Sequence, residues 1–220
     1  MRVVTAGGHG KIAQLTHREL AGRGDTAVGL IRNPDHAAAL RAAGAHPVVA
    51  DLEHVGVDEL ADHLHGADAV LFAAGAGPGS GAARKDTVDR AAAVLLADAA
   101  ERADVRRYLL LSSVGVEGEA PAGTDEVFAA YLRAKKAAED DLTGRDLDWT
   151  ILRPGRLTDD PPTGRITLTR HAPAGAAVTR TDVARVLVAL LYHPGTAGRI
   201  LELVDGDTTI ADAIAAVDRR

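Results

Sequence analysis

The sequence Arg2-Val3-Val4-Thr5-Ala6-Gly7-Gly8-His9-Gly10-Lys11-Ile12-Ala13 places an apolar run directly before a glycine-rich turn and an amphipathic run directly after it. This order is typical of a strand-to-helix turn that binds phosphate, because glycine permits a tight turn and a close approach of the backbone to an anion. The helix that follows presents unpaired N–H groups and the positive end of its dipole to the same anion. The spacing is G-x-x-G-x-x-A, at Gly7, Gly10 and Ala13.

The residues around this turn argue against a triphosphate-binding loop. Such a loop has the pattern G-x-x-x-x-G-K-[ST], in which the final hydroxyl reaches the metal. Here Ile12 follows Gly10-Lys11, and Thr5 stands where the first glycine should be. A dinucleotide site remains, provided that a βαβ unit and a residue for the adenosine ribose follow.

Composition restricts the class of protein further. The 220 residues suffice for one domain of generous size, and 46% of them are apolar, which is enough for a buried core. The net charge of −6 and the lack of a basic block argue against nucleic acid as a partner. The chain has no cysteine, so disulfides, thiolate chemistry and cysteine zinc sites are unavailable, and we expect no metal site.

No targeting or membrane segment is visible in the sequence. The chain begins directly with the first apolar run, without the features of a signal peptide, and no apolar run approaches the roughly 18 residues of a membrane span. We therefore expect a soluble cytoplasmic protein, a monomer or homodimer, that acts on a small-molecule substrate and binds no membrane.

Strand and helix patterns alternate along most of the chain. The strand patterns are apolar on both faces, as in a parallel sheet covered by helices on both sides. We therefore predict an α/β fold with a doubly wound parallel sheet, of the Rossmann type, in a single domain over residues 1–220. The predicted strands are Val3–Ala6, Thr26–Ile31, Pro47–Ala50, Ala69–Ala73, Tyr108–Leu111 and Asp148–Leu152, and the predicted helices are Lys11–Ala21, Pro34–Ala43 (capped by Asn33), Val57–Leu64, Asp86–Arg102 and Glu126–Leu142.

The pattern changes after Pro154, where proline and glycine become frequent. We predict a mostly irregular segment over 154–177 with one strand at Arg165–Leu168. The remaining predicted elements are a helix Val183–Tyr192 capped by Thr181-Asp182, a strand Arg199–Val204 and a helix Ile210–Val217. Too few residues remain for an independent substrate domain, so residues 154–220 are expected to form a lid and wall on the substrate side.

The end of the second predicted strand distinguishes the two nicotinamide cofactors. NAD sites place an acid there to accept hydrogen bonds from the ribose 2′-hydroxyl, whereas this chain has Ile31-Arg32-Asn33. A guanidinium suits a 2′-phosphate through charge-assisted bonds, so Arg32 favours NADP(H) over NAD(H). The alternative is a solvated surface arginine. His9 is a second candidate contact, and its alternative is a solvated loop histidine.

The ends of the third and fourth predicted strands supply further candidate residues. Asp51-Leu52 places a carboxylate where it could meet the adenine edge or simply start the next turn. Ala73-Ala74-Gly75 offers residues too small to obstruct a ribose that lies across the sheet.

The strongest catalytic signal is a tyrosine and a lysine four residues apart in a predicted helix. Tyr131 and Lys135 project from one helix face at this spacing. A tyrosine pKa is normally about 10, and we expect the neighbouring ammonium to lower it enough for proton transfer. Ser112-Ser113 closes the fifth predicted strand, where a hydroxyl could hydrogen-bond a substrate carbonyl. A chance surface contact between Tyr131 and Lys135 is the alternative.

Together these motifs resemble the short-chain dehydrogenase/reductase superfamily, in its atypical branch of small NAD(P)-binding proteins, which includes the NmrA-like and biliverdin-reductase-B-like proteins. The resemblance implies a Rossmann fold with Ser113, Tyr131 and Lys135 as catalytic residues, and Lys135 also holds the nicotinamide ribose. It places Arg153-Pro154-Gly155 beside the nicotinamide. The implied cofactor contacts also include Gly7, His9, Gly10, Lys11, Ile12, Arg32, Asp51, Leu52, Ala73, Ala74, Gly75 and Ser112.

The functional hypothesis is an NADP(H)-dependent oxidoreductase that passes a hydride to or from a small carbonyl, alcohol, quinone or flavin-like substrate. In it Tyr131 moves the proton, Lys135 tunes the tyrosine and Ser113 orients the oxygen. Two alternatives stay open: a regulatory protein that senses NADP(H) without turnover, and an isomerase similar to NAD(P)-dependent sugar epimerases. The residues between Pro154 and Val178 match no recognition motif, so the substrate itself is not predicted.

Overall fold

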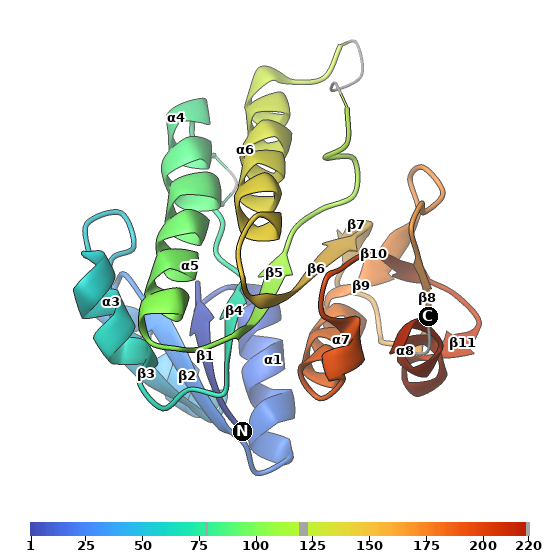
Figure 1. Cartoon of the computed structure of the whole chain (residues 1–220). Helices are drawn as coiled ribbons and strands as arrows, with labels where there is room; N and C mark the ends of the chain where they lie inside the picture. Colours follow the sequence, from blue (N-terminus) through green and yellow to red (C-terminus); the bar gives the residue numbers. More distant parts are fainter. Residues whose placement is uncertain (78, 119–122, 219–220) are drawn as a thin grey trace.

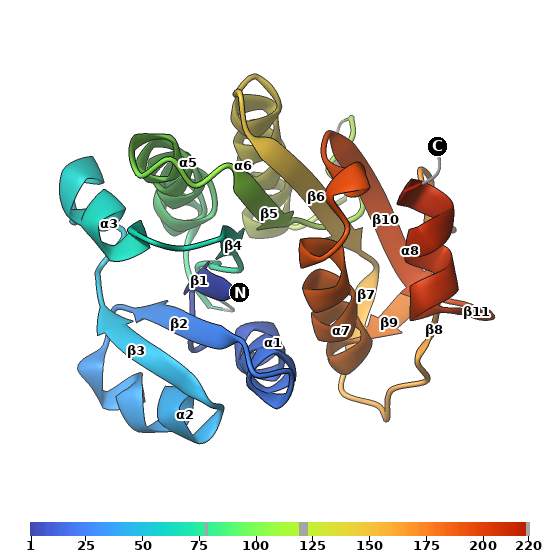
Figure 2. The same ribbon diagram turned by 60° about the horizontal axis from the view of Figure 1, so that its bottom comes forward.

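The computed structural model describes residues 1–77, 79–118 and 123–218, and these form a central sheet between two layers of helices (Figures 1 and 2). The sheet has nine strands in the described residues, in the order β11-β8-β10-β6-β5-β4-β1-β2-β3. A separate two-stranded sheet pairs β7 with β9. The strands are β1 Arg2–Ala6, β2 Thr26–Ile31, β3 Ala45–Val49, β4 Ala69–Phe72, β5 Arg107–Leu111, β6 Asp148–Pro154, β7 Arg156–Thr158, β8 Arg165–Thr169, β9 Ala177–Thr179, β10 Arg199–Asp205 and β11 Thr208–Thr209.

The helices connect successive strands. The α-helices are α1 Lys11–Gly22, α2 Ala37–Ala42, α3 Val57–Leu64, α4 Ala82–Arg84, α5 Ala92–Arg102, α6 Glu126–Thr143, α7 Arg180–Leu191 and α8 Ile210–Asp218. Two short 3₁₀ turns, η1 Pro34–His36 and η3 Pro194–Thr196, and one π-helix, η2 Lys85–Ala91, complete the described helical segments.

The strand order confirms the predicted doubly wound fold. The run β3-β2-β1-β4-β5-β6 is parallel throughout, and the chain reverses its direction of growth between β1 and β4. Ligands of such sheets bind beyond the carboxyl ends of the strands at this reversal point. The glycine turn that follows β1 therefore lies where a ligand is expected.

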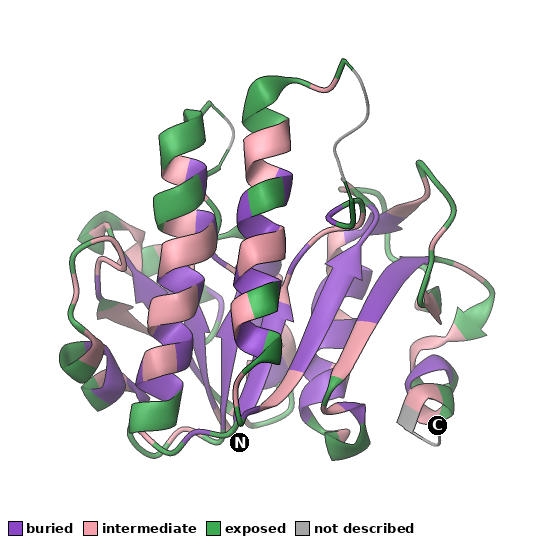
Figure 3. Ribbon diagram, turned by 45° about the horizontal axis from the view of Figure 1, so that its top comes forward, coloured by how far each residue is buried: buried purple, intermediate pink, exposed green. Residues whose placement is uncertain are grey.

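Both faces of the sheet are buried, which explains the apolar strand sequences. Val3 and its neighbours on one face pack with Leu20 of α1 and Leu187 of α7. Val4 and its neighbours on the other face pack with Leu64 of α3 and Leu96 of α5. The central strands are accordingly buried along their length, while the outer sides of the helices are exposed (Figure 3).

The turn after β1 depends on a glycine at its first position. Gly7 has φ +78°, and a Cβ there would lie 2.5 Å from the Cα of Ala74. The turn thus lies directly against the end of the segment after β4. Helix α1 begins at Lys11, and no side chain caps its first turn.

The C-terminal third differs most from the sequence prediction. The parallel pair β7 and β9 was not predicted, because strands of three residues show no periodicity and their pairing depends on distant parts of the chain. Strand β10 lies parallel to β6, and β8 lies antiparallel to β10, so this part extends the central sheet. The predicted cap of α7 was wrong by two residues: Thr179 is the cap, and its hydroxyl accepts from the Asp182 N–H at 3.0 Å.

Two earlier predictions also need correction. Strand β3 begins at Ala45, two residues before the predicted start at Pro47, since its pairing with β2 begins there. The predicted helix Asp86–Arg102 is helical, but its first turns belong to the π-helix η2, and the helical segment starts earlier, at Ala82. Asn33 does cap the next turn, because its side chain accepts from the Asp35 N–H.

A buried histidine makes the stability of the fold dependent on pH. His17 of α1 is fully buried, and neither ring nitrogen has a hydrogen-bond partner among the described residues. Burial lowers its pKa to about 4 from 6.5. Below pH 6.5 the unfolded chain therefore binds a proton at His17 and the folded chain does not. The free energy of unfolding falls by about 3 kcal/mol as the pH decreases to 4.

Urea unfolding at neutral pH and at pH 4.5 measures this loss. The His17→Leu variant is expected to lose less stability on acidification than the wild type, because its leucine does not titrate. His46→Leu is the matched control, since His46 is exposed on β3. Equal acid sensitivity of His17→Leu and the wild type would contradict the assignment.

Candidate functional site

Two adjacent cavities open at the carboxyl edge of the sheet, and both are bordered by the segment Ala73–Ala76 after β4. The first, which we name the turn cavity, has a volume of about 420 Å³. The second, the tyrosine cavity, has a volume of about 800 Å³. Predicted residues that border the turn cavity are Gly7, His9, Gly10, Arg32, Asp51 and Leu52, and those that border the tyrosine cavity are Ser112, Ser113, Tyr131, Lys135, Pro154 and Gly155; Ala73, Ala74 and Gly75 border both.

A carboxylate already lies between two arginines in the turn cavity. Arg32 donates to Glu53 at 3.1 Å, and Arg84 donates to the same oxygen at 2.6 Å. Thr87 donates to the other oxygen at 2.7 Å. The hydrogen bond from Arg84 is the main reason that the pKa of Glu53 is lowered. Arg84 and Glu53 were not singled out from the sequence, because they meet Arg32 only when helix α4 and the segment after β3 come together at the end of β2.

Two histidine rings form another wall of the turn cavity. His9 of the glycine turn stacks on His36 of η1, with ring centroids 3.6 Å apart. Burial and the neighbouring His36 lower the pKa of His9. The His9 ring is therefore neutral at pH 7, and the stacked pair presents a flat surface that suits an aromatic ring. Because its ring stacks on His36, His9 is not the freely solvated loop histidine that was the alternative prediction.

The Asp51 carboxylate is used within its own turn. One oxygen accepts from the Glu53 N–H at 3.1 Å, and the other lies 2.9 Å from Nδ1 of His54. These contacts match the structural alternative for Asp51, although the residue still borders the turn cavity.

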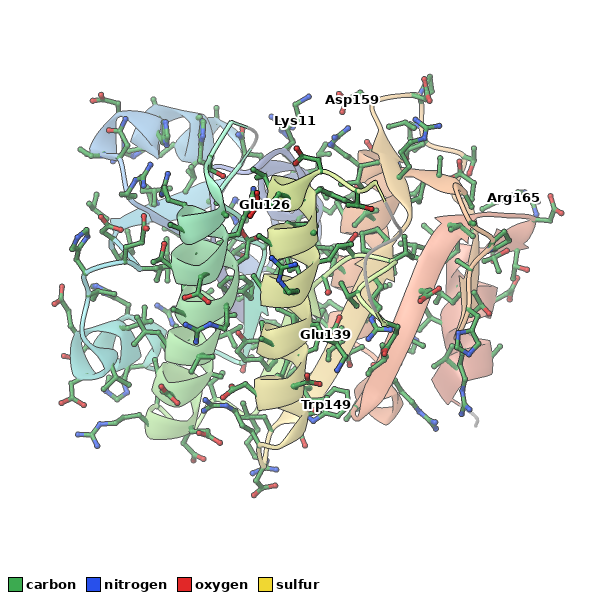
Figure 4. The ribbon with its side chains drawn as sticks, turned by 90° about the horizontal axis from the view of Figure 1, so that it is seen from above. Lys11, Glu126, Glu139, Trp149, Asp159 and Arg165 are labelled. Carbon is green, nitrogen blue, oxygen red and sulfur yellow. The ribbon has the colours of Figure 1, made fainter. Side chains whose placement is uncertain are left out.

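Two predicted cofactor residues, Lys11 and Ile12, are absent from the described lining of both cavities. Ile12 is buried in the core. The Lys11 ammonium pairs with Asp159 at 2.8 Å, and Figure 4 shows these two side chains near each other. Asp159 also pairs with Arg180 at 2.8 Å. Only the backbone N–H groups of Lys11 and Ile12, at the uncapped start of α1, remain as donors toward the turn.

In the tyrosine cavity, Lys135 has a buried carboxylate as its partner. Its Nζ donates to the Leu111 carbonyl at 3.1 Å and lies 3.5 Å from Oδ1 of Asp89. Lys135 and Asp89 are both buried. The Tyr131 ring centroid is 5.9 Å from the same Nζ. The lysine is thus near the tyrosine but paired with the aspartate.

Asp89 was missed in the sequence analysis, and the sequence did contain a signal for it. Asp89 lies seven residues before Leu96 and four before Ala93, which are buried on the inner face of the same helical segment. An acid at helical spacing within an apolar face indicates a buried partner of opposite charge. The π-helix η2 carries Asp89, and its other oxygen accepts from the Ala76 N–H at 3.1 Å. π-helical turns occur frequently at functional sites.

The electrostatics of Tyr131 differ from the sequence expectation. Burial, and then the Asp89 carboxylate, raise the pKa of Tyr131 to about 12, while a hydrogen bond with Ser113 acts in the opposite direction. The expected lowering by Lys135 was therefore wrong, because the ammonium is paired with Asp89. Burial in turn lowers the pKa of Lys135, and Asp89 opposes this effect. Tyr131 retains its proton at neutral pH.

The serines after β5 lie in the same cavity. Ser113 donates to the Val114 carbonyl at 3.1 Å. The Ser112 hydroxyl is buried and has no hydrogen-bond partner among the described residues. A buried hydroxyl without a partner is costly, so it is available to a bound molecule.

The structure directs the Arg153 side chain away from both cavities. Its guanidinium is buried against Glu139 of α6, with hydrogen bonds of 2.9 Å and 2.5 Å, and it also donates to Glu117 at 2.5 Å. Glu139 lies on α6, well below its first residue Glu126 (Figure 4). Alternate residues of a strand face opposite sides, so Pro154 borders the tyrosine cavity while Arg153 does not.

These residues fit a dinucleotide. The start of α1 is uncapped beside the turn cavity. Two arginines and the stacked histidine rings border the same cavity, next to the end of β2. An anion at such a helix start gains from both the free N–H groups and the dipole. The fold and the paired cavities therefore define a dinucleotide-binding protein of the Rossmann class.

Comparison with known proteins gives the family. The model of the NAD(P)H-binding family matches residues 7–194, and the chain belongs to this family. Membership of this family supports a nicotinamide dinucleotide as the cofactor. This agrees with the resemblance to small NAD(P)-binding reductases inferred from the motifs.

Three relatives cover nearly the whole chain. A Bacillus subtilis protein named "Uncharacterized sugar epimerase YhfK" is 32% identical over 97% of this chain and 99% of its own. A solved structure from Bacillus halodurans, described as a putative NAD-dependent epimerase/dehydratase, is 36% identical, with a TM-score of 0.90 and coverage of 98% and 99%. The oxidoreductase ylbE from Lactococcus lactis is 26% identical, with a TM-score of 0.85 and coverage of 100% and 98%.

None of the helices in the described ranges has the length and apolar character needed to cross a membrane.

Proposed function

We propose that the protein is an NADP(H)-dependent oxidoreductase that reduces a small carbonyl or quinone-like substrate. The observation that carries the proposal is the Tyr131 phenol in one cavity with Ser112, Ser113 and the Lys135–Asp89 pair. A phenol beside a substrate carbonyl can donate its proton as the carbonyl oxygen gains charge, and the raised pKa makes Tyr131 a weaker acid than an ordinary tyrosine.

The chain's own residues have distinct roles in this proposal. When bound, the nicotinamide supplies the hydride. Tyr131 donates the proton to the substrate oxygen, and the Ser113 hydroxyl, which hydrogen-bonds Tyr131, orients that oxygen. Lys135 and Ser112 hold polar groups of the cofactor or substrate between α6 and the end of β5. Asp89 balances the Lys135 charge and keeps the Tyr131 proton in place.

A screen of NADPH oxidation over quinones, flavins and small aldehydes tests the proposal. We expect steady turnover with at least one of these substrates. The turnover is measured as the decrease in NADPH absorbance. Tight NADPH binding without any turnover would instead support the regulatory alternative.

The epimerase alternative draws on the names of two relatives, YhfK and the Bacillus halodurans structure. An epimerase returns its hydride to the same substrate and so shows no net consumption of cofactor. Nucleotide sugars added to the NAD⁺-loaded protein would show this by a change of sugar configuration alone.

Preference for NADP(H) is a prediction that rests on Arg32. A 2′-phosphate between Arg32 and Arg84 would replace the contact that each now makes with Glu53. Charge-assisted bonds contribute about 1.5–3 kcal/mol, so Arg32→Ala is expected to weaken NADPH binding about ten- to a hundredfold and NADH binding far less. Calorimetric titration with each cofactor measures the difference. Arg41→Ala, at an exposed position on α2, is the control, and equal losses for both cofactors would make Arg32 a bystander.

A further inference from the structure

Lys85 is a buried cation without an anionic partner in the described structure. Its side chain borders the tyrosine cavity and is 9% exposed. Its Nζ donates to the Gly77 carbonyl at 3.0 Å and lies 5.6 Å from the centroid of the Tyr131 ring. No carboxylate of the described residues lies within 4.0 Å of it, whereas its neighbour Asp86 is paired with Arg90.

The other charges of the tyrosine cavity do not neutralise Lys85. The two acids that border the cavity are both engaged: Asp89 pairs with Lys135, and Asp125 accepts from the Phe128 N–H as the cap of α6. Among the cations, Arg180 is paired with Asp159. Arg156 of β7 borders the same cavity and forms no ion pair in the described part of the chain. In the described part of the chain, Lys85 and Arg156 at this cavity therefore form no ion pair, and the only bordering carboxylate outside an ion pair is Asp125 at the start of α6.

A buried ammonium with only one carbonyl acceptor is unfavourable, because burial removes its hydration and no opposite charge compensates. Arg84, the preceding residue, faces the turn cavity, while Lys85 faces the tyrosine cavity beside the proposed proton donor. The molecule that meets Tyr131 is therefore placed to supply the missing charge.

We propose that the tyrosine cavity binds carboxylate-bearing substrates, with the Lys85 ammonium as counter-charge and Arg156 as a second cation at the opposite wall. The inference rests on the proposed function for the reaction that the bound molecule undergoes. The binding of a carboxylate is a separate claim, which is tested without turnover. The rest of the substrate is apolar, because Phe128 and Val127 of α6 border the cavity with 51% and 36% of their surface exposed. The Phe128 ring lies 5.8 Å from the Tyr131 ring and extends the flat apolar wall.

Calorimetric titration of the NADP⁺-loaded protein with 2-naphthoate and 2-naphthamide tests the proposal. The two probes share one ring system and differ in charge. We expect naphthoate to bind at least tenfold more tightly at low ionic strength, and added salt to reduce the difference. Lys85→Met is expected to bring the two affinities within about twofold, and Arg156→Gln to reduce the difference partly.

Arg165→Gln is the matched control, because Arg165 of β8 bonds the Asp207 carbonyl and borders neither cavity. NADP⁺ affinity and circular dichroism report whether each variant is folded. Equal affinities of the two probes in the wild type, no binding of either, or an unchanged preference in both variants would each overturn the proposal.

A second assay distinguishes failure of the proposed reductase function from failure of the carboxylate-binding inference. Steady-state reduction of 4-carboxybenzaldehyde and of its neutral methyl ester is measured on the same preparations. If naphthoate is preferred through Lys85 but neither aldehyde is reduced, the anion site stands and the reductase proposal loses support. If both aldehydes are reduced equally and the probes bind equally, the reductase stands and the anion site is refuted.

Discussion

Tyr131→Phe is expected to lower kcat for carbonyl reduction by about 10²–10⁴-fold and to leave NADPH affinity nearly unchanged. The substitution removes one hydroxyl, the proposed proton donor, and retains the ring that packs beside Phe128. Because burial and Asp89 raise the pKa of Tyr131 to about 12, the wild-type rate of reduction is expected to be level through neutral pH. It should fall only as the pH approaches 12, where the phenol loses its proton.

The control for this prediction is Tyr192→Phe, the same chemical change at an exposed tyrosine that follows α7 and hydrogen-bonds Asp25. That variant should retain wild-type kcat. Stopped-flow measurement of a single turnover separates the chemical step from product release. A Tyr131→Phe variant with wild-type kcat would show that another group, or water, supplies the proton.

The second large effect is expected from Asp89→Asn. This change leaves the Lys135 ammonium buried without a carboxylate, and breaking a buried pair in this way costs about 3–5 kcal/mol. Urea unfolding measures the loss. In the double variant Asp89→Asn/Lys135→Met neither charge of this pair remains, so its loss of stability should be smaller than the sum of the two single losses.

Asp98→Asn is the matched control for Asp89→Asn. Asp98 is 46% exposed, and its partner Arg145 keeps two further carboxylates, Glu101 and Asp141, so the loss should be below about 1 kcal/mol. The pH dependence of the reduction rate is a second measurement, since removal of the Asp89 carboxylate should lower the pKa of Tyr131. The reduction rate of Asp89→Asn would then decline at a lower pH than that of the wild type. Equal, small losses in Asp89→Asn and Asp98→Asn would refute the buried pair.

Most of the fold could be predicted because the signals were local. The strand Thr26–Ile31 and the helix Val57–Leu64 were predicted at their observed bounds. Periodic burial, the glycine turn and strand–helix alternation are all properties of short windows of sequence. Strands β7 and β9 were missed because they are three residues long and depend on each other across the loop that contains β8.

The candidate site was predicted in part, for the same reason. Tyr131 and Lys135 share one helix, and the serines end one strand, so their proximity follows from element order. The pairing of Lys135 with Asp89 joins two helical segments, and the π-helix that presents Asp89 has no recognised sequence pattern. Arg153 was predicted to lie beside the nicotinamide, but its side chain pairs with the buried Glu139 of α6 and points away from the cavity.

By itself, the sequence determined the doubly wound sheet, the glycine turn at Gly7 and the edge at which Tyr131, Lys135 and the serines gather. These follow from backbone sterics and hydrophobic periodicity, which act over a few residues. Only the tertiary structure decided the charges of the site: that Lys135 is neutralised by Asp89, that Tyr131 keeps its proton and that Lys85 forms no ion pair with any described residue. Burial and pairing set those properties, and both depend on residues that are far apart in the chain.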